Sequence, residues 1–152
     1  GALAAEQREH WERISSTIEG PQALMVNTGR DASFDAIFST AGFTYVGLTA
    51  NSSSPSASDT SLTGQITTAS GGLVAKSCTY AHTSGTSTAT LTGTFTANGS
   101  DSLPVTVAKV GLRSASGIGG TFHSSTLLSS TATLSASGDA LTVTWTFTLT
   151  PS

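Results

Sequence analysis

The sequence predicts a mainly β protein, an antiparallel β-sandwich of jelly-roll-like form with an N-terminal helix and a short second helix before it. The strongest indication is residues 140–150, in which apolar residues alternate strictly with threonine. Successive side chains of a strand point to opposite faces, so one face of this strand is apolar and the other carries hydroxyl groups. Residues 86–97 repeat the alternation. Two such one-sided strands are typical of two sheets packed face to face.

The same alternation predicts which side chains form the core. The apolar face of the closing strand points inward, and burial of each large side chain contributes about 1.5–3 kcal/mol. The helix expected before the sheets adds two phenylalanines to this core. The predicted core residues are Phe34, Phe38, Leu91, Phe95, Leu141, Val143, Trp145, Phe147 and Leu149.

Length and composition bound the organisation of the chain. Its 152 residues are enough for one sizeable core and few for two. We expect an N-terminal helical arm at 1–20, a connector with a short helix at 21–40, and a β-sandwich domain at 41–152. Charged residues make up only 10% of the chain, against about 25% in ordinary proteins, and they crowd the first twenty positions. The solubility of the β domain must therefore come from hydroxyl groups.

The apolar residues of the arm are spaced so that they would form one narrow stripe along a helix. Residues 2–18 contain no glycine or proline, and Gly20-Pro21 would end the helix. Such a thin stripe on a terminal helix can dock along the chain's own β domain, remain partly frayed, or contact another subunit. For the last alternative, the predicted subunit-contact residues are Leu3, Trp11, Ile14 and Ile18.

The second helix is predicted from Asn27 onward. Thr28 and Asp31 are spaced as a capping box, in which each side chain accepts a hydrogen bond from a free backbone N–H at the helix start. Phe34, Ile37 and Phe38 then share one side of the helix. We expect this helix to plug an open end or edge of the sheets.

The remaining strands follow from short β-type runs between turn signals. Strands are expected at residues 43–48, 73–81, 86–97 and 127–136, besides the closing strand. In a regular strand Val105 and Val107 would point to one face, whereas Val110 and Leu112 would point to the other. This reversal predicts a β-bulge or a change of sheet near Ala108-Lys109. Residues 137–139 predict a tight hairpin that pairs strand 127–136 with the closing strand. Together with the run around Val105 to Leu112, we expect about seven strands in all.

The sequence offers little for catalysis or metal binding. His10, His82 and His123 stand far apart without partners at metal-ligand spacing, and there is no Gly-x-Ser-x-Gly elbow. Assigning either of the last two histidines to Asp101 or Asp139 as a triad would be arbitrary. We predict no catalytic residue, no metal site and no cofactor, and we interpret Cys78 as a small buried apolar residue.

The composition also bears on partners. A nearly neutral β domain argues against nucleic-acid binding, which needs clustered Lys and Arg. No apolar run reaches the length of a membrane span, and charge follows residues 1–5 where a signal peptide would have its apolar core. The threonine-rich faces are either solvated outer faces or uncharged surfaces that bind protein or sugar.

Several segments resemble a family of small structural proteins of tailed bacteriophages. They are Asn27-Thr28-Gly29-Arg30-Asp31, residues 45–49 leading into 55–62, Val110-Gly111-Leu112, and the ending at residues 137–145. The likeness covers roughly residues 26–150, and its motifs are compositional and turn-like. Family members typically carry a Gly-Thr-Gly-Thr type run after the first strand, where this chain has Leu48-Thr49-Ala50-Asn51-Ser52.

The resemblance implies a non-enzymatic component of a virion. The first hypothesis is a capsid cement or decoration protein on the outer shell, assembled in the host cytoplasm. Its partners would be the major capsid protein and copies of itself, without nucleic acid or membrane. The alternatives are a tail- or neck-associated virion protein, or a carbohydrate-binding or adhesin-like sandwich whose partner is a glycan. An enzyme of unrecognised type ranks last.

Overall fold

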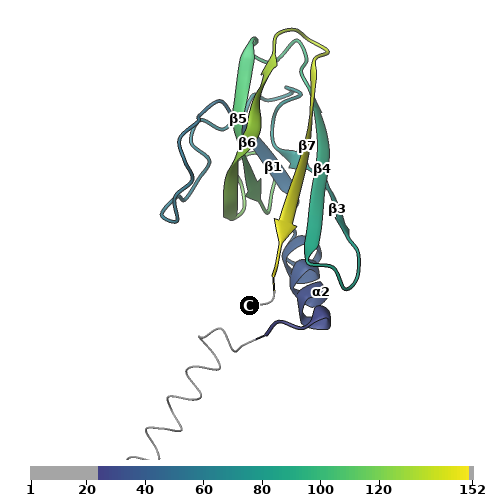
Figure 1. Ribbon diagram of the computed structural model, residues 1–152. Coiled ribbons are helices and arrows are strands. Elements are labelled where there is room, and N and C mark those ends of the chain that lie inside the picture. The colour runs from purple at the N-terminus through teal and green to yellow at the C-terminus, as the bar shows by residue number, and fades with distance from the viewer. Residues whose placement is uncertain (1–23, 151–152) are drawn as a thin grey trace, which may run out of the picture.

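A computed structural model describes residues 24–150 of the chain. In this part the protein is mainly β, with two antiparallel sheets that lie face to face and one short helical segment at one end (Figure 1). One sheet has the strand order β2-β1-β5-β6 and the other has the order β3-β4-β7. The elements are α2 (Asn27–Asp35), the π-helical turn η1 (Ala36–Thr40), β1 (Tyr45–Thr49), β2 (Lys76–Ser77), β3 (Thr79–His82), β4 (Thr88–Thr96), β5 (Val105–Arg113), β6 (Phe122–Leu134) and β7 (Ala140–Thr148).

The three-stranded sheet follows directly from the threonine alternation. Strands β4 and β7 pair along their whole length, from Thr88 opposite Thr148 to Thr96 opposite Ala140. This register places threonine opposite threonine on one face and apolar residues opposite each other on the other face. Because a shift by one residue would turn every apolar side chain toward water, the alternation fixes the register.

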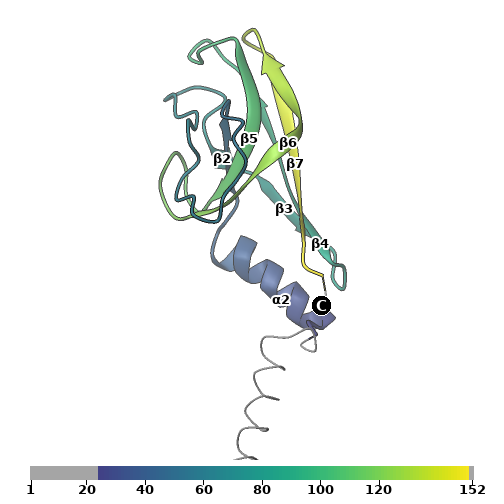
Figure 2. The same ribbon diagram turned by 60° about the vertical axis from the view of Figure 1, so that its left-hand side comes forward.

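Strand β5 lies in the middle of the four-stranded sheet and contains the expected irregularity. Its pairing with β6 shifts between Val107 and Lys109, which confirms the β-bulge; β5 does not change sheet. The extra residue restores the apolar parity, so that Val107, Val110 and Leu112 all face the core. Its other face is covered by the long connection between β1 and β2, which lies outside β5 in Figure 2.

The expected single strand at 73–81 is wrong. The chain forms β2, paired with β1, and then β3, paired with β4 in the other sheet. The change of sheet takes place at Cys78, whose backbone N–H donates to the carbonyl of Thr44 (2.8 Å). Cys78 is buried, as the sequence predicts. One flank of the sandwich is therefore crossed by the chain itself.

The expected hairpin between 127–136 and the closing strand is also wrong. Strand β6 pairs with β5, and β7 pairs with β4, so the two strands lie in different sheets. The turn between them forms, with Gly138 at φ 98° and the Asp139 carboxylate accepting hydrogen bonds from the N–H groups of Ser135 and Ala136. The turn therefore reverses the direction of the chain, but the two strands that it joins do not pair with each other.

The helical segment lies against the end of the three-stranded sheet. Phe34 and Phe38 are buried in the core, and Ile37 is partly buried. Phe38 packs against Tyr80 and Phe147, with ring centroids 5.0 and 4.9 Å away. The predicted capping box is wrong, because Val26 is the N-cap residue and no side chain caps the helix start.

The predicted core residues all contact the shared interior, to different depths. Phe34, Phe38, Leu91, Phe95 and Val143 are buried. Leu141, Trp145, Phe147 and Leu149 are partly buried and pack against that core. The closing strand therefore presents the predicted face to the core but keeps part of it open, because β7 is an edge strand.

One glycine tests how closely the β1–β2 connection approaches the end of β4. A Cβ atom added at Gly72 would lie 1.6 Å from the carbonyl oxygen of Thr96, whereas one added at Gly99 would meet nothing within 4 Å. We expect Gly72→Ala to lower the free energy of unfolding by at least about 1–3 kcal/mol, the cost of overpacking. Gly99→Ala, the matched control, should stay within about 0.5 kcal/mol of the wild type. Chemical denaturation measures both, and equal stabilities would contradict the close approach.

Candidate interaction surface

The outer face of the β3-β4-β7 sheet is an uncharged, hydroxyl-rich surface. Four threonine pairs span β4 and β7, from Thr88 opposite Thr148 to Thr94 opposite Thr142. The Oγ1 atoms of the last pair lie 3.0 Å apart and share a hydrogen bond. Nearly all of these threonines are exposed. The threonine face consists of Thr79, Ala81, Thr88, Thr90, Thr92, Thr94, Thr96, Thr142, Thr144, Thr146 and Thr148.

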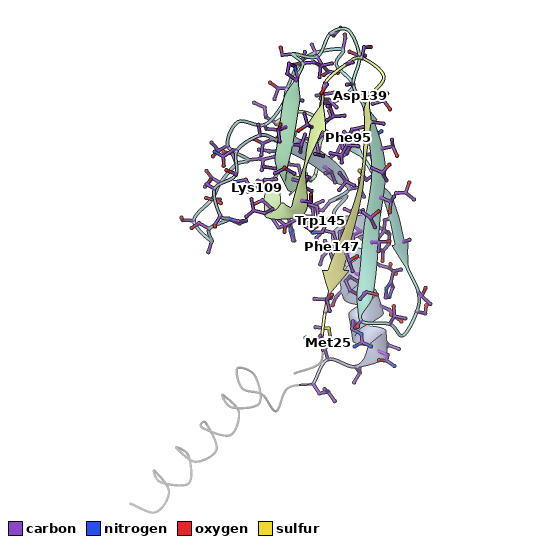
Figure 3. All side chains as sticks on the ribbon, turned by 45° about the horizontal axis from the view of Figure 1, so that its top comes forward. Met25, Phe95, Lys109, Asp139, Trp145 and Phe147 are labelled. Carbon is purple, nitrogen blue, oxygen red and sulfur yellow. The ribbon has the colours of Figure 1, made fainter. Side chains whose placement is uncertain are left out.

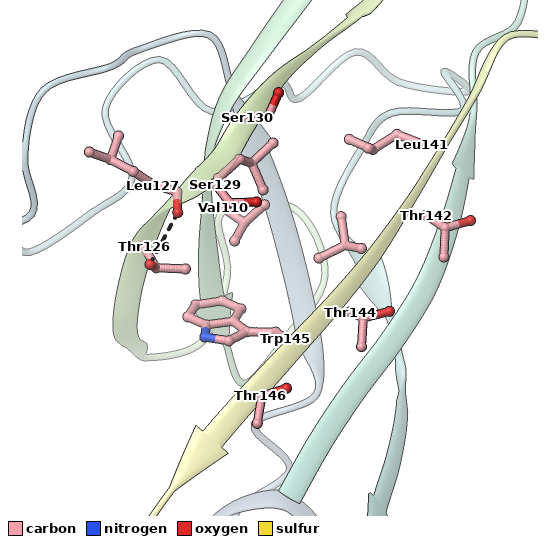
Figure 4. Close-up of a pocket in the computed structure, with 12 residues that line it drawn as sticks. Val110, Thr126, Leu127, Ser129, Ser130, Leu141, Thr142, Thr144, Trp145 and Thr146 are labelled. Atoms are coloured by element: carbon pink, nitrogen blue, oxygen red, sulfur yellow. Dashed lines mark hydrogen bonds between the residues drawn. The ribbon is translucent and has the colours of Figure 1, made fainter.

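A cleft of about 460 Å³ opens between β6 and β7, on the flank opposite Cys78. Figure 4 shows the indole of Trp145 extending from β7 toward β6, with Leu141 further along the same strand. Six of the twelve lining residues are apolar and six carry hydroxyl groups, among them Thr126, Ser129 and Ser130 on β6. Trp145 stacks on Phe147 with ring centroids 4.8 Å apart. The cleft therefore exposes part of the sandwich interior.

Both strands beside the cleft are sheet edges. Strand β6 ends the order β2-β1-β5-β6, and β7 ends the order β3-β4-β7. Neither contains Lys, Arg, Asp, Glu or Pro, the residues by which natural proteins protect edge strands from pairing. The flank thus combines an uncharged, partly apolar cleft with two unprotected edges.

A short apolar segment is exposed at the start of the described part of the chain. Leu24, Met25 and Val26 are 63%, 37% and 59% exposed, and Val26 has extended backbone angles (φ −78°, ψ 164°). We call these three residues the apolar leader. The predicted contact residues Leu3, Trp11, Ile14 and Ile18 precede it and lie outside the described residues, as does the predicted arm at 1–20.

Burial removes most cations from the described surface. Residues 24–150 contain four Lys and Arg, of which Arg30, Lys109 and Arg113 are buried. Neutral oxygens accept their hydrogen bonds: Lys109 donates to Asn51 Oδ1 and the Ser53 carbonyl, and Arg113 donates to Gln65 Oε1 and the Ile118 carbonyl. The long side chain of Lys109 lies toward the β1–β2 connection (Figure 3). These cations fasten loops onto β5.

His82 and Asp31 fasten the helix to the β3–β4 hairpin. His82 Nε2 lies 2.7 Å from Asp31 Oδ1, and Nδ1 lies 2.8 Å from the Thr88 carbonyl oxygen. Both partners accept, so the ring satisfies both only when each nitrogen carries a proton. The Thr88 carbonyl and the Asp31 carboxylate raise the pKa of His82. Hydrogen bonds from His82 and from the Gly85 N–H lower the pKa of Asp31.

Asp101, Asp139 and His123, which a triad would have to bring together, lie apart. Asp101 accepts hydrogen bonds from the N–H groups of Gly72 and Asn98, and Asp139 caps the β6–β7 turn. His123 contacts Ser124 Oγ and packs against Phe43, and burial lowers its pKa. Among residues 24–150, no three His, Cys, Asp or Glu side chains gather as a metal site. None of the helices described there is long and apolar enough to cross a membrane.

Sequence reasoning missed the cleft, the His82–Asp31 pair and the buried cations. The cleft depends on which strands are edges, which local alternation does not encode. The His82–Asp31 pair joins residues 51 positions apart. One signal was present for Lys109: it directly follows the bulge position between two apolar runs. A charged residue there requires oxygen partners from a covering loop.

Comparisons of the chain with protein-family models, with curated proteins and with solved structures found no match.

The His82–Asp31 pair predicts a pH-dependent stability. A raised pKa makes the contribution of His82 fully present below its ordinary value of 6.5 and lost as the pH rises through the folded value. A lowered pKa makes the contribution of Asp31 present above its ordinary value of 3.8 and lost as the pH falls through the folded value. We therefore expect His82→Gln to lower the free energy of unfolding more between about pH 4 and 6 than above about pH 8.

The control for this measurement is His123→Gln. Because burial lowers the pKa of His123, removal of its charge should stabilise the chain relative to the wild type as the pH falls below 6.5, the opposite sign. Denaturant titrations across this pH range compare the three proteins. A His82→Gln effect that is the same at every pH would contradict the assignment of a charged imidazole.

Proposed function

We propose that the chain is a non-enzymatic structural protein of a virion, a cement or decoration protein that binds the outer capsid shell and neighbouring subunits. The observation that carries this proposal is the uncharged flank at β6 and β7, where a partly apolar cleft lies between two unprotected strand edges. Such edges are prone to pair with other chains. A protein that works in an assembly has these edges covered by its neighbours.

The threonine face supports the same proposal. Association through charged groups requires their desolvation, whereas threonine offers methyl groups for packing and hydroxyl groups for hydrogen bonds. A wide hydroxyl-rich sheet suits a shell surface with repeated contacts. The resemblance of residues 26–150 to structural proteins of tailed bacteriophages adds a second, independent line of support.

Within this proposal, the β sandwich sits on the capsid and the arm at 1–20 contacts a neighbouring subunit through Leu3, Trp11, Ile14 and Ile18. The jelly-roll-like form stays a prediction from the sequence. A tail or neck location for the same protein is the nearest alternative. The position of its density in a reconstruction of the intact particle decides between the two locations.

Removal of residues 1–20 tests the role of the arm. We expect the shortened chain to lose binding to capsid shells, because the apolar stripe of the arm supplies the subunit contact. Its thermal unfolding should stay close to that of the full chain, since residues 24–150 contain the core described above. Occupancy on purified shells is measured by sedimentation with quantitative gel analysis. Unchanged occupancy would refute this role of the arm.

A further inference from the structure

The cleft between β6 and β7 has the features of a site for an added β-strand. Trp145, Leu141 and Leu128 are partly buried apolar side chains that face or flank it. The two edges beside it carry backbone N–H and C=O groups that no strand of the described part pairs on that side. An extended segment could hydrogen-bond to an edge and place alternate side chains in the cleft.

The chemistry of the cleft restricts the occupant. Its lining contains no charged side chain, so a charged segment would lose hydration without gaining a partner. The occupant should be short, extended and uncharged, with apolar side chains to pack against Trp145, Leu141 and Leu128. The apolar leader, Leu24 to Val26, meets each requirement: it is exposed, it carries no charge and its last residue has extended backbone angles.

The leader cannot reach Trp145 of its own chain. The start of α2 is held at the β3–β4 hairpin, where Asp31 accepts a hydrogen bond from the Gly85 N–H (3.0 Å). From Gly85 to Leu91, the register partner of Trp145, the chain covers roughly 20 Å. Three extended residues span only about 10 Å. Figure 3 shows Met25 at the foot of the molecule, beyond Phe147 and Trp145.

We propose that the apolar leader of one copy adds as a strand beside the β6–β7 cleft of a second copy, with Leu24 and Val26 directed into the cleft. This inference rests on the proposed function, since it specifies how neighbouring subunits make contact. The partner is a second copy because the same chain carries both the open cleft and a complementary exposed segment. Each copy thereby provides one leader and one cleft, which permits closed rings as well as longer arrays.

Self-association of the full chain tests the proposal by sedimentation velocity over a range of concentrations. We expect the wild type to form oligomers. The double variant Leu24→Asp/Val26→Asp should raise the dissociation constant of these oligomers at least about tenfold, since two apolar contacts are lost. The matched control is Ile118→Asp, which changes an apolar side chain that is 69% exposed in another loop. This control should associate like the wild type.

Cysteine pairing locates the contact. Copies with Leu24→Cys are mixed with copies with Ser130→Cys, both in a Cys78→Ala background that removes the chain's one cysteine. We expect a disulfide-linked mixed dimer under mild oxidation. Replacement of the second partner by Ser58→Cys, in an exposed loop of the β1–β2 connection, should give little product.

The outcomes separate this inference from the proposed function. A monomeric wild type, an unaffected double aspartate variant, or no more Leu24–Ser130 mixed dimer than Leu24–Ser58 mixed dimer would overturn the inference. A monomer that binds a glycan on an array would also overturn it and would favour the carbohydrate-binding alternative. Removal of residues 1–20 leaves the leader in place, so lost or retained shell binding tests the proposed function separately.

Discussion

The passage of the chain from one sheet to the other at Cys78 determines the shape of the sandwich. Strand β2 pairs with β1 on one side of this residue, and β3 pairs with β4 on the other. A side chain on Gly93 would collide with the Cys78 sulfur, since an added Cβ would lie 2.4 Å from it. The continuous chain through Cys78 joins the two sheets along this flank. On the opposite flank only the short turn between Leu134 and Ala140 joins β6 to β7, and the cleft beside Trp145 stays open.

A second consequence concerns charge. The four-stranded sheet does not leave its outer face to water, because the β1–β2 connection covers β5. Lys109 and Arg113 project on this covered side and donate to neutral loop oxygens. Burial of a cation costs free energy that such hydrogen bonds only partly offset. These hydrogen bonds hold the loop in place. They also leave Lys76 as the one exposed Lys or Arg among residues 24–150.

Residue patterns predicted what is local, and long-range pairing decided the rest. Alternation identified the faces of β4 and β7, and a parity change identified the bulge before Lys109. The sequence predicts the turn ending at Asp139 but not the sheets of its two strands, because a turn fixes only the direction of the chain. Pairing with β4 gave β7 a full register of matched threonines, which β6 cannot offer. Local spacing predicts a helix cap at Asp31, because its partner His82 lies 51 residues away and leaves no local signal.

The open flank, the unprotected edges and the apolar leader are best understood together. Each feature alone is a hazard for an isolated chain, because exposed apolar surface and unpaired strands promote uncontrolled association. An ordinary monomer would place Lys or Pro on β6 or β7, and this sequence has neither there. In an ordered assembly the same features become the contact, and charge at the edge would oppose it. Under the proposed function, the near absence of charge is a property of the surfaces that meet a neighbour.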